Sequence, residues 1–311
     1  MTRSARSSTH LLCAVFAATL VLAAVPLPAR AQLEIKFGHV GNPGSLFAKS
    51  AEEFARRANA ALGGKAKVVV YGSSQLGGDK EMLQKLKLGT LDMALPSTVM
   101  SSEVDLLGFF EMPYIVKDRA HMHRIEEAIF WPSMEPAIEK KGLKVLAVWE
   151  NGFRQITNNK HPIRVPADLN GIKLRVPNGK WRVRMFEAYG ANPSPMKFSE
   201  LFTALQTGVM DGEENPLTQI YSAKLQEVQK YLSMSGHVYT PAYLTVGTKH
   251  WETLPADVRK VLEDTAKETQ AFVYQVAAHD EEELLGKLTQ AGMQVNDVDK
   301  DAFIAASKPI Y

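Results

Sequence analysis

The sequence predicts an α/β protein made of two domains. Stretches that alternate apolar and polar residues, as half-buried strands do, are followed by longer stretches whose apolar residues recur at helical spacing. The first such run places strands at 33–40 and 67–71 and helices at 45–61 and 80–88. Subtracting a leader of 31 residues from the 311 residues leaves 280, and a chain of that length usually divides into two domains.

The first 31 residues have the composition of a secretory signal peptide. Arg3 and Arg6 precede an apolar run from Leu11 to Val25, and Ala29-Arg30-Ala31 fits the cleavage rule of small residues around a variable one. The apolar run is shorter than the roughly 20 residues that a membrane span needs. We therefore expect an exported protein. The single cysteine lies inside this leader, so we expect the mature chain to be stabilised by packing and not by disulfides.

The charge balance and the motifs argue against nucleic acid, metals and cofactors as partners. The leader holds three of the 36 Lys and Arg residues, which leaves 36 − 3 = 33 against 34 Asp and Glu, with no basic stripe. His121 and His123 lie two apart in a predicted helix, so they do not share a face as a metal-binding pair would. The glycine-rich loop at 72–79 has neither a Walker lysine nor a G-x-G-x-x-G pattern, which favours a plain turn over a nucleotide site.

Residues 172–176 predict a short half-buried strand. Its apolar residues point to one face, Lys173 and Arg175 point to the other, and Pro177 ends it. Arg175 is thus the last charged side chain before the chain leaves the sheet, and the ends of strands border the ligand crevice in open α/β sheets. A guanidinium there matches the two oxygens of a carboxylate, although an ordinary surface ion pair is the commoner role for one arginine.

A helix and an extended polar segment follow this strand. The helix is predicted at 199–209, with Phe198 or Ser199 near its start, and Asp211-Gly212 then makes a turn. The chain continues as Glu213-Glu214-Asn215-Pro216, in which the proline favours an extended backbone. Adjacent residues of an extended segment face opposite sides, and we expect the two glutamates to form a solvated charge pair, although Glu214 could instead help to order the loop around Asn215.

The remaining elements place further polar residues at strand ends. Ser97 follows the strand at 91–95, and Arg154 follows the strand at 143–149. A short strand at 155–157 is expected to cross into the second domain, and a strand at 239–248 to carry Tyr239. Pro255 suits the first turn of a long helix that ends near Leu288.

The order of these segments resembles the DctP-like solute-binding proteins of TRAP transporters over nearly the whole mature chain. The motifs that carry the resemblance are Leu174-Arg175-Val176-Pro177, Glu214-Asn215-Pro216 and the loop from Ser74 to Asp79. The resemblance implies a two-lobed periplasmic binding protein fold, in which each lobe is a mixed sheet flanked by helices and a long helix braces both. Lobe I would comprise 32–152 plus 241–280, and lobe II 153–240 plus 281–311. Relatives usually continue with a further helix, so we expect the C-terminus to be shorter than theirs.

The resemblance also implies the residues of a ligand site. Arg175 would hold the carboxylate of an organic acid, Asn215 would assist it, and Arg154 would provide a second cation. Loops of the first lobe would bring three polar residues to the ligand on closure, namely His39, Asp79 and Ser97. Asn178 completes the polar set. Three aromatic rings could stack on a ligand, although each is more often part of the core: Trp181, Phe198 and Tyr239.

The resemblance further implies a non-enzymatic, monomeric periplasmic receptor that delivers its acid to membrane permease subunits. Arg154 and the hydroxyl-binding character of Asp79 and Ser97 favour a sugar acid or another hydroxylated monocarboxylate. A C4-dicarboxylate, a keto acid or an aromatic acid stays open. A secreted hydrolase is the competing class, but the mature sequence has no G-x-S-x-G, no H-E-x-x-H and no cysteine nucleophile. A purely structural module is the third, and it would have no internal cleft.

Overall fold

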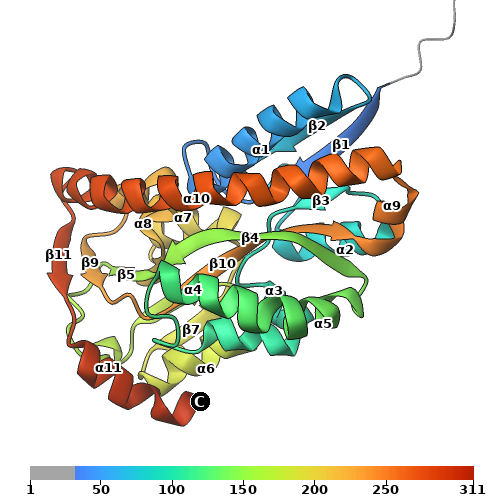
Figure 1. Ribbon diagram of the computed structural model, residues 1–311. Helices are drawn as coiled ribbons and strands as arrows, with labels where there is room; N and C mark the ends of the chain where they lie inside the picture. Colours follow the sequence, from blue (N-terminus) through green and yellow to red (C-terminus); the bar gives the residue numbers. More distant parts are fainter. Residues whose placement is uncertain (1–31) are drawn as a thin grey trace, which may run out of the picture. The chain divides into compact units, whose positions relative to one another are not determined.

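Two mixed β-sheets organise the protein (Figure 1). The computed structural model describes residues 32–311, so the predicted leader lies outside the described residues. The first sheet has the strand order β2-β1-β3-β10-β4 and the second the order β11-β9-β5-β8-β6-β7. In the first sheet β1, β2 and β3 run parallel, and β10 pairs antiparallel with both β3 and β4. In the second sheet β6 pairs parallel with β7 and β8, whereas β5 pairs antiparallel with β8 and β9.

The strands are mostly short. Those of the first sheet are β1 Leu33–Gly38, β2 Ala66–Tyr71, β3 Met93–Ala94, β4 Leu143–Phe153 and β10 Tyr239–Gly247. Those of the second are β5 Gln155–Asn158, β6 Lys173–Val176, β7 Asn192–Pro195, β8 Gly212–Asn215, β9 Tyr231–Met234 and β11 Gln294–Asp297.

The helices that flank the sheets vary from one turn to 35 residues. The α-helices are α1 Leu46–Leu62, α2 Asp79–Leu88, α3 Met100–Glu103, α4 Arg119–Ile125, α5 Glu135–Glu139, α6 Lys180–Ala188, α7 Phe198–Gln206, α8 Leu217–Ser222, α9 Thr248–Thr253, α10 Ala256–Gln290 and α11 Lys300–Ser307. The 3-10 segments are η1 Asp105–Glu111, η3 Pro166–Leu169, η4 Leu225–Glu227 and η5 Lys308–Ile310, and η2 Glu126–Met134 is π-helical. None of the helices in 32–311 combines the length and hydropathy that a membrane span needs.

The long helix α10 packs against β4 of the first sheet and against α8 beside the second, along the course that Figure 1 shows. Leu262 and Val273, in its first half, belong to the core around the first sheet. Leu284 and Leu288, near its end, belong to a core beside the second sheet. The chain also crosses between the sheets at the β4–β5 junction and again between β9 and β10. The prediction of two mixed sheets flanked by helices, with one long bracing helix, is confirmed.

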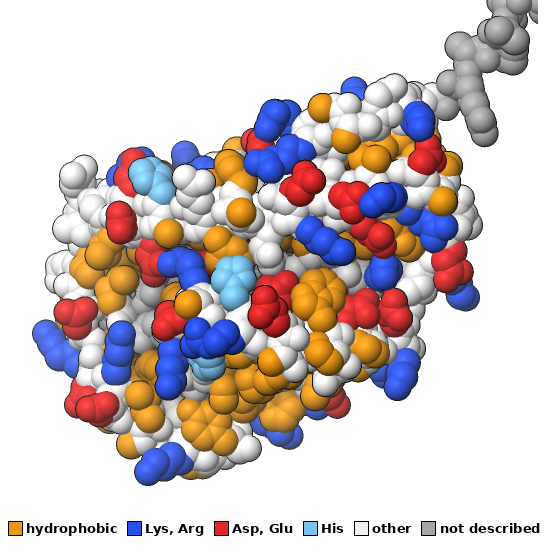
Figure 2. Space-filling model, in the orientation of Figure 1, with side chains coloured by type: hydrophobic (Ala, Val, Ile, Leu, Met, Phe, Trp, Pro, Cys, Tyr) orange, Lys and Arg blue, Asp and Glu red, His pale blue; other side chains and the backbone are white. Residues whose placement is uncertain are grey.

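Two elements differ from the sequence-based expectation. The strand predicted at 143–149 continues to Phe153, because Glu150, Gly152 and Phe153 still pair with β10, while a register shift between Thr240 and Pro241 leaves Asn151 without a partner in that strand. The expectation that Glu213 and Glu214 are solvated is wrong, since both are 0% exposed within β8. Their partners are distant in sequence and are described with the site. Figure 2 shows Lys and Arg interspersed with Asp and Glu over the visible face.

The packing of α10 predicts that a leucine-to-alanine substitution lowers stability more at Leu288 than at Leu88. Leu288→Ala should lower the free energy of unfolding by about 2–5 kcal/mol, because Leu288 is fully buried and leaves a cavity. Leu88→Ala in α2 should change it by less than about 0.5 kcal/mol, because Leu88 is 77% exposed. Urea unfolding of both variants measures the difference. Equal losses would contradict the packing of the end of α10 on the second core.

Candidate ligand-binding site

A small internal cavity lies where loops of the two sheets meet. Its volume is about 40 Å³, and an adjoining cavity of about 30 Å³ shares six of its lining residues. The first sheet contributes the residues that follow β1 and β3 and the start of α2, and the second contributes the ends of β6 and β8 and the start of α7. The polar residues that line the larger cavity are Asp79, Ser97, Thr98, Asn151, Arg154, Arg175, Asn215 and Gln219. Polar side chains from both sheets therefore surround one small cavity.

Arg175 presents a buried positive charge to both cavities. Its side chain is 3% exposed at the end of β6. Nε and Nη2 donate hydrogen bonds of 3.0 and 2.7 Å to the carbonyl oxygen of Met196, which fixes the plane of the guanidinium. Burial lowers its pKa to about 10, so the group stays charged at neutral pH. Among residues 32–311, no carboxylate lies within ion-pair distance of it.

Two carboxyl groups near Arg175 compensate its charge only in part. Burial raises the pKa of Asp79 to about 7 and that of Glu213 also to about 7, while the positive charge of Arg175 opposes both shifts. Each group therefore carries a partial negative charge at neutral pH. A buried cation with such weak compensation is costly, and a carboxylate ligand would remove that cost.

Arg154 differs from Arg175 because its charge is already balanced. Its Nε and Nη2 atoms donate to the carboxylate of Glu214 at 2.5 and 3.0 Å, and Nη2 also donates to Oδ1 of Asn215 at 3.0 Å. Arg154 lines the larger cavity, but it is not an unpaired cation there. Arg154 therefore does not provide the unpaired second cation that the resemblance had implied.

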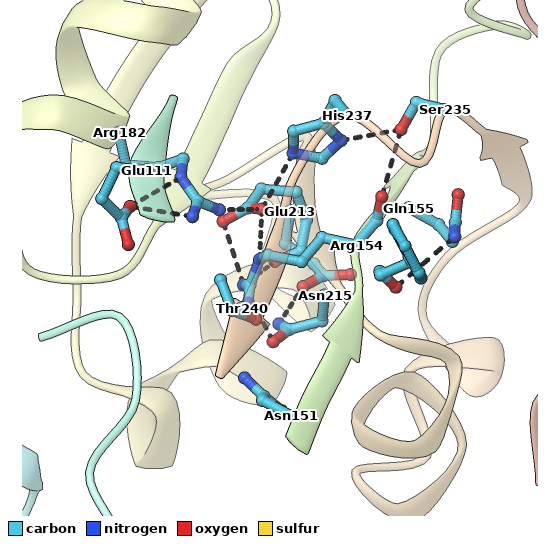
Figure 3. A network of polar contacts seen from close by, with 12 residues as sticks. Glu111, Asn151, Arg154, Gln155, Arg182, Glu213, Asn215, Ser235, His237 and Thr240 are labelled. Atoms are coloured by element: carbon cyan, nitrogen blue, oxygen red, sulfur yellow. Dashed lines mark hydrogen bonds and ion pairs between the residues drawn. The ribbon is translucent and has the colours of Figure 1, made fainter. Parts of the chain in front are cut away.

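Glu214 is the common partner of Arg154, Arg182 and His237 in a buried network. Figure 3 shows these three residues together with Glu111 and Asn215. Besides Arg154, Glu214 contacts Nη1 of Arg182 at 2.5 Å and Nε2 of His237 at 3.1 Å, and Arg182 also pairs with Glu111 at 2.8 Å. Although burial opposes ionisation, Arg154 and Arg182 hold the pKa of Glu214 well below its usual range. Burial lowers the pKa of His237, which favours the neutral ring. The network therefore balances its own charges and fixes Asn215 beside the cavity.

The residues that the sequence proposed for the site divide into two groups. Asn178 lines the adjoining cavity. Six others line the larger cavity: Asp79, Ser97, Arg154, Arg175, Phe198 and Asn215. Phe198 lies 5.9 Å from the guanidinium carbon of Arg175, measured to the ring centroid, so the ring packs against the cation.

His39, Tyr239 and Trp181 line neither cavity. His39 is buried beside Gly41 and Gly72, and burial lowers its pKa to about 4. The ring of Tyr239 packs edge-on against Phe153 at 5.0 Å. Trp181 packs on Gly108, so its indole covers η1 and does not reach the ligand cavity. His39 and Tyr239 are buried, whereas Trp181 is half-buried, and all three pack against protein groups outside the two cavities.

The sequence did not indicate Asn151 and Gln219 in the cavity, or Arg182, His237 and Glu111 in the charge network. Arg182 and Arg184 both lie in α6, and the sequence does not show that the first is fully buried while the second is exposed. The one available signal is the polar pair Glu150-Asn151 inside an otherwise apolar strand, which is unusual for a buried element. Among residues 32–311, no group of three or more His, Cys, Asp or Glu side chains is arranged to hold a metal ion.

Comparison with known proteins gives a consistent family. The family model of bacterial extracellular solute-binding proteins, family 7 (DctP), matches residues 37–311. The C4-dicarboxylate-binding periplasmic protein DctP of Rhodobacter capsulatus is 36% identical over 91% of this chain and 86% of its own.

Two solved structures are close in fold. A TRAP periplasmic solute-binding protein from Polaromonas, bound to D-erythronate, is 33% identical with a TM-score of 0.86, covering 90% of this chain and 93% of that one. The sugar acid binding protein of Advenella mimigardefordensis, in complex with galactonate, is 32% identical with a TM-score of 0.87, covering 90% and 91%. The chain therefore belongs to the DctP family, the periplasmic solute-binding proteins of TRAP transporters.

Proposed function

We propose that this protein binds the carboxylate of an organic acid through Arg175 and delivers the acid to the membrane permease of a TRAP transporter. The observation that carries the proposal is the charge of Arg175, which is 3% exposed, lines the cavity and has no ion-pair partner among residues 32–311. A carboxylate ligand would supply the missing negative charge, and the planar guanidinium suits its two oxygens. Asn215, held by Arg154, would add a neutral hydrogen bond.

The ligand that fits this cavity best is a hydroxylated monocarboxylate such as a sugar acid. Arg175 is the cation available to one carboxylate, since Glu214 balances Arg154. A second carboxylate of the same ligand would meet the partial negative charge of Asp79. The relatives from Polaromonas and Advenella bind the hydroxylated acids D-erythronate and galactonate, which supports this choice. The dicarboxylate-binding relative from Rhodobacter makes a C4-dicarboxylate the second candidate.

The remaining parts of the proposal concern export and movement. Residues 1–31 act as a cleaved signal peptide, and the mature protein is a monomeric receptor without catalytic activity. Lobe I (32–152 plus 241–280) and lobe II (153–240 plus 281–311) rotate as bodies about the crossing segments. Contacts such as Lys197 to Glu81 at 2.5 Å and Lys180 to Asp105 at 2.6 Å join segments of the two proposed lobes near the cavity. They would form on closure and break on opening.

Substitution of Arg175 tests the carboxylate contact. Arg175→Ala should weaken binding of the best acid by about 2–5 kcal/mol, because a buried charge pair loses one partner. Arg175→Lys should also bind much more weakly, because the two-pronged donor is lost. Calorimetry measures both, with Arg184→Ala, an exposed arginine of α6, as the matched control that should bind normally. Wild-type affinity in the lysine variant would contradict the assignment.

The carboxyl groups beside Arg175 predict a pH dependence. The negative charge of a bound acid should raise the pKa values of Asp79 and Glu213 above about 7, so binding takes up protons. Affinity should therefore increase as the pH falls from 8 to 6, while the acid itself stays ionised. Calorimetry in buffers of different ionisation enthalpy measures the proton uptake, which Asp79→Asn should reduce. Proton release on binding would contradict the predicted proton uptake.

Closure of the two lobes is testable in solution. Small-angle scattering should give a smaller radius of gyration with saturating ligand than without it, because the lobes rotate together around the acid. Arg175→Ala at the same ligand concentration is the control, and its curve should not change. Identical curves for the wild-type protein with and without ligand would count against a hinged receptor.

A further inference from the structure

A chain of three buried side chains leads from β10 to the cavity. The hydroxyl of Ser97 donates a hydrogen bond of 2.6 Å to the carbonyl oxygen of Pro241, and Nδ2 of Asn151 donates to the same hydroxyl oxygen at 3.2 Å. Nε2 of Gln219 then donates to Oδ1 of Asn151 at 3.4 Å. Ser97, Asn151 and Gln219 come from three different elements and all line the larger cavity. We refer to these three residues as the polar relay.

The direction of the relay is fixed at its inner end. The carbonyl of Pro241 can only accept, so Ser97 must give its proton to it. The serine oxygen can then only accept from its other neighbour, which requires Nδ2 of Asn151 on that side. Asn151 consequently presents Oδ1 to Gln219, and Gln219 must donate a hydrogen bond to it from Nε2. Rotation of either amide by half a turn would bring two acceptors together.

The outer end of the relay is an acceptor without a partner. Gln219 is 3% exposed, and its Oε1 atom makes no hydrogen bond within residues 32–311. A buried amide oxygen in this state is unfavourable, and a hydroxyl donor removes the penalty whereas a carboxylate or a methylene group does not. The oxygen therefore selects for a ligand O–H group.

No free cation compensates this acceptor. Arg154, which also lines the cavity, is committed to Glu214 and Asn215. Asp79 Oδ1, a second buried atom without a partner, adds another acceptor to the same cavity. Among residues 32–311, Arg175 is thus the arginine of this cavity that has no ion-pair partner, and the acceptor atoms favour hydroxyl groups elsewhere on the ligand.

We propose that Gln219 is a specificity-determining residue that accepts a hydrogen bond from a ligand hydroxyl, and that Ser97 and Asn151 are positioning residues that fix its orientation. This inference rests on the proposed binding of an acid by Arg175. It assigns the selectivity for hydroxylated acids to an amide of α8 and gives Ser97 an indirect role, since its own proton is already used.

The test compares acids that differ by one hydroxyl. Calorimetry on the full mature chain gives the dissociation constants of D-erythronate and galactonate, then of the singly deoxygenated forms of the tighter binder. At one position of the ligand, removal of the hydroxyl should raise the dissociation constant by about tenfold, which is the scale of one buried hydrogen bond. In Gln219→Leu, the ratio between the dissociation constants of the deoxygenated and the parent acid should fall to about one for that position, because the acceptor is gone.

Ser97→Ala gives a second readout that a merely structural role of Gln219 would not produce. It keeps Gln219 but removes the oxygen that orients Asn151, so both amides can turn and offer a donor to the ligand. The preference for the hydroxylated acid over the dicarboxylate succinate should therefore decrease. Thr218→Val is the matched control: Thr218 is adjacent, 6% exposed and also has a hydroxyl without a partner, but it lines a separate cavity of about 20 Å³.

The possible outcomes separate this inference from the function on which it rests. A hydroxyl preference that survives in Gln219→Leu, or that disappears equally in Thr218→Val, overturns the role of Gln219. Equal binding of all the deoxygenated forms by the wild-type protein also overturns it, while leaving the contact with Arg175 intact. Absence of binding by both parent acids contradicts the proposed function and this inference with it.

Discussion

The charge of Arg175 is the constraint on which the site depends. A guanidinium that is 3% exposed and has only partial negative charges near it is unfavourable unless an anion pairs with it. Its plane is nevertheless fixed by the carbonyl of Met196, so the cation is oriented before any ligand arrives. An anion that enters the cavity gains from both features, because it meets a charge that is already desolvated and already in position.

The other two buried arginines near the cavity, unlike Arg175, have their charges balanced by carboxylates. Arg154 and Arg182 are as deeply buried as Arg175, but Glu214 and Glu111 pair with them at 2.5 to 2.8 Å. The protein thus balances two of three buried arginines internally and leaves the third to the cavity. The balanced pair still has a role, since Arg154 holds Asn215 beside the site. Such a network explains how a second arginine can line a ligand cavity without attracting a second carboxylate.

The predictability of each part from sequence depends on how local its cause is. Arg175 could be placed at a strand end because the alternation of residues 172–176 and the following Pro177 are local signals. The burial of Glu214 could not be predicted, because its partners Arg154 and Arg182 lie 60 and 32 residues away. The same holds for Gln219, whose amide is oriented by Asn151 and, through it, by Ser97. Tyr239 and Trp181 carry rings suited to ligand stacking, and only the folded structure shows that Tyr239 packs on Phe153 and that Trp181 packs on Gly108.

The central claim is that Arg175 recognises a negative charge and not merely a polar group. The most direct measurement compares the best-binding acid with its primary carboxamide, which has nearly the same shape and no charge. We predict that the carboxamide binds at least about 30-fold more weakly, because truncating a buried charge pair costs roughly 2–5 kcal/mol. Equal dissociation constants for the acid and the amide would contradict it.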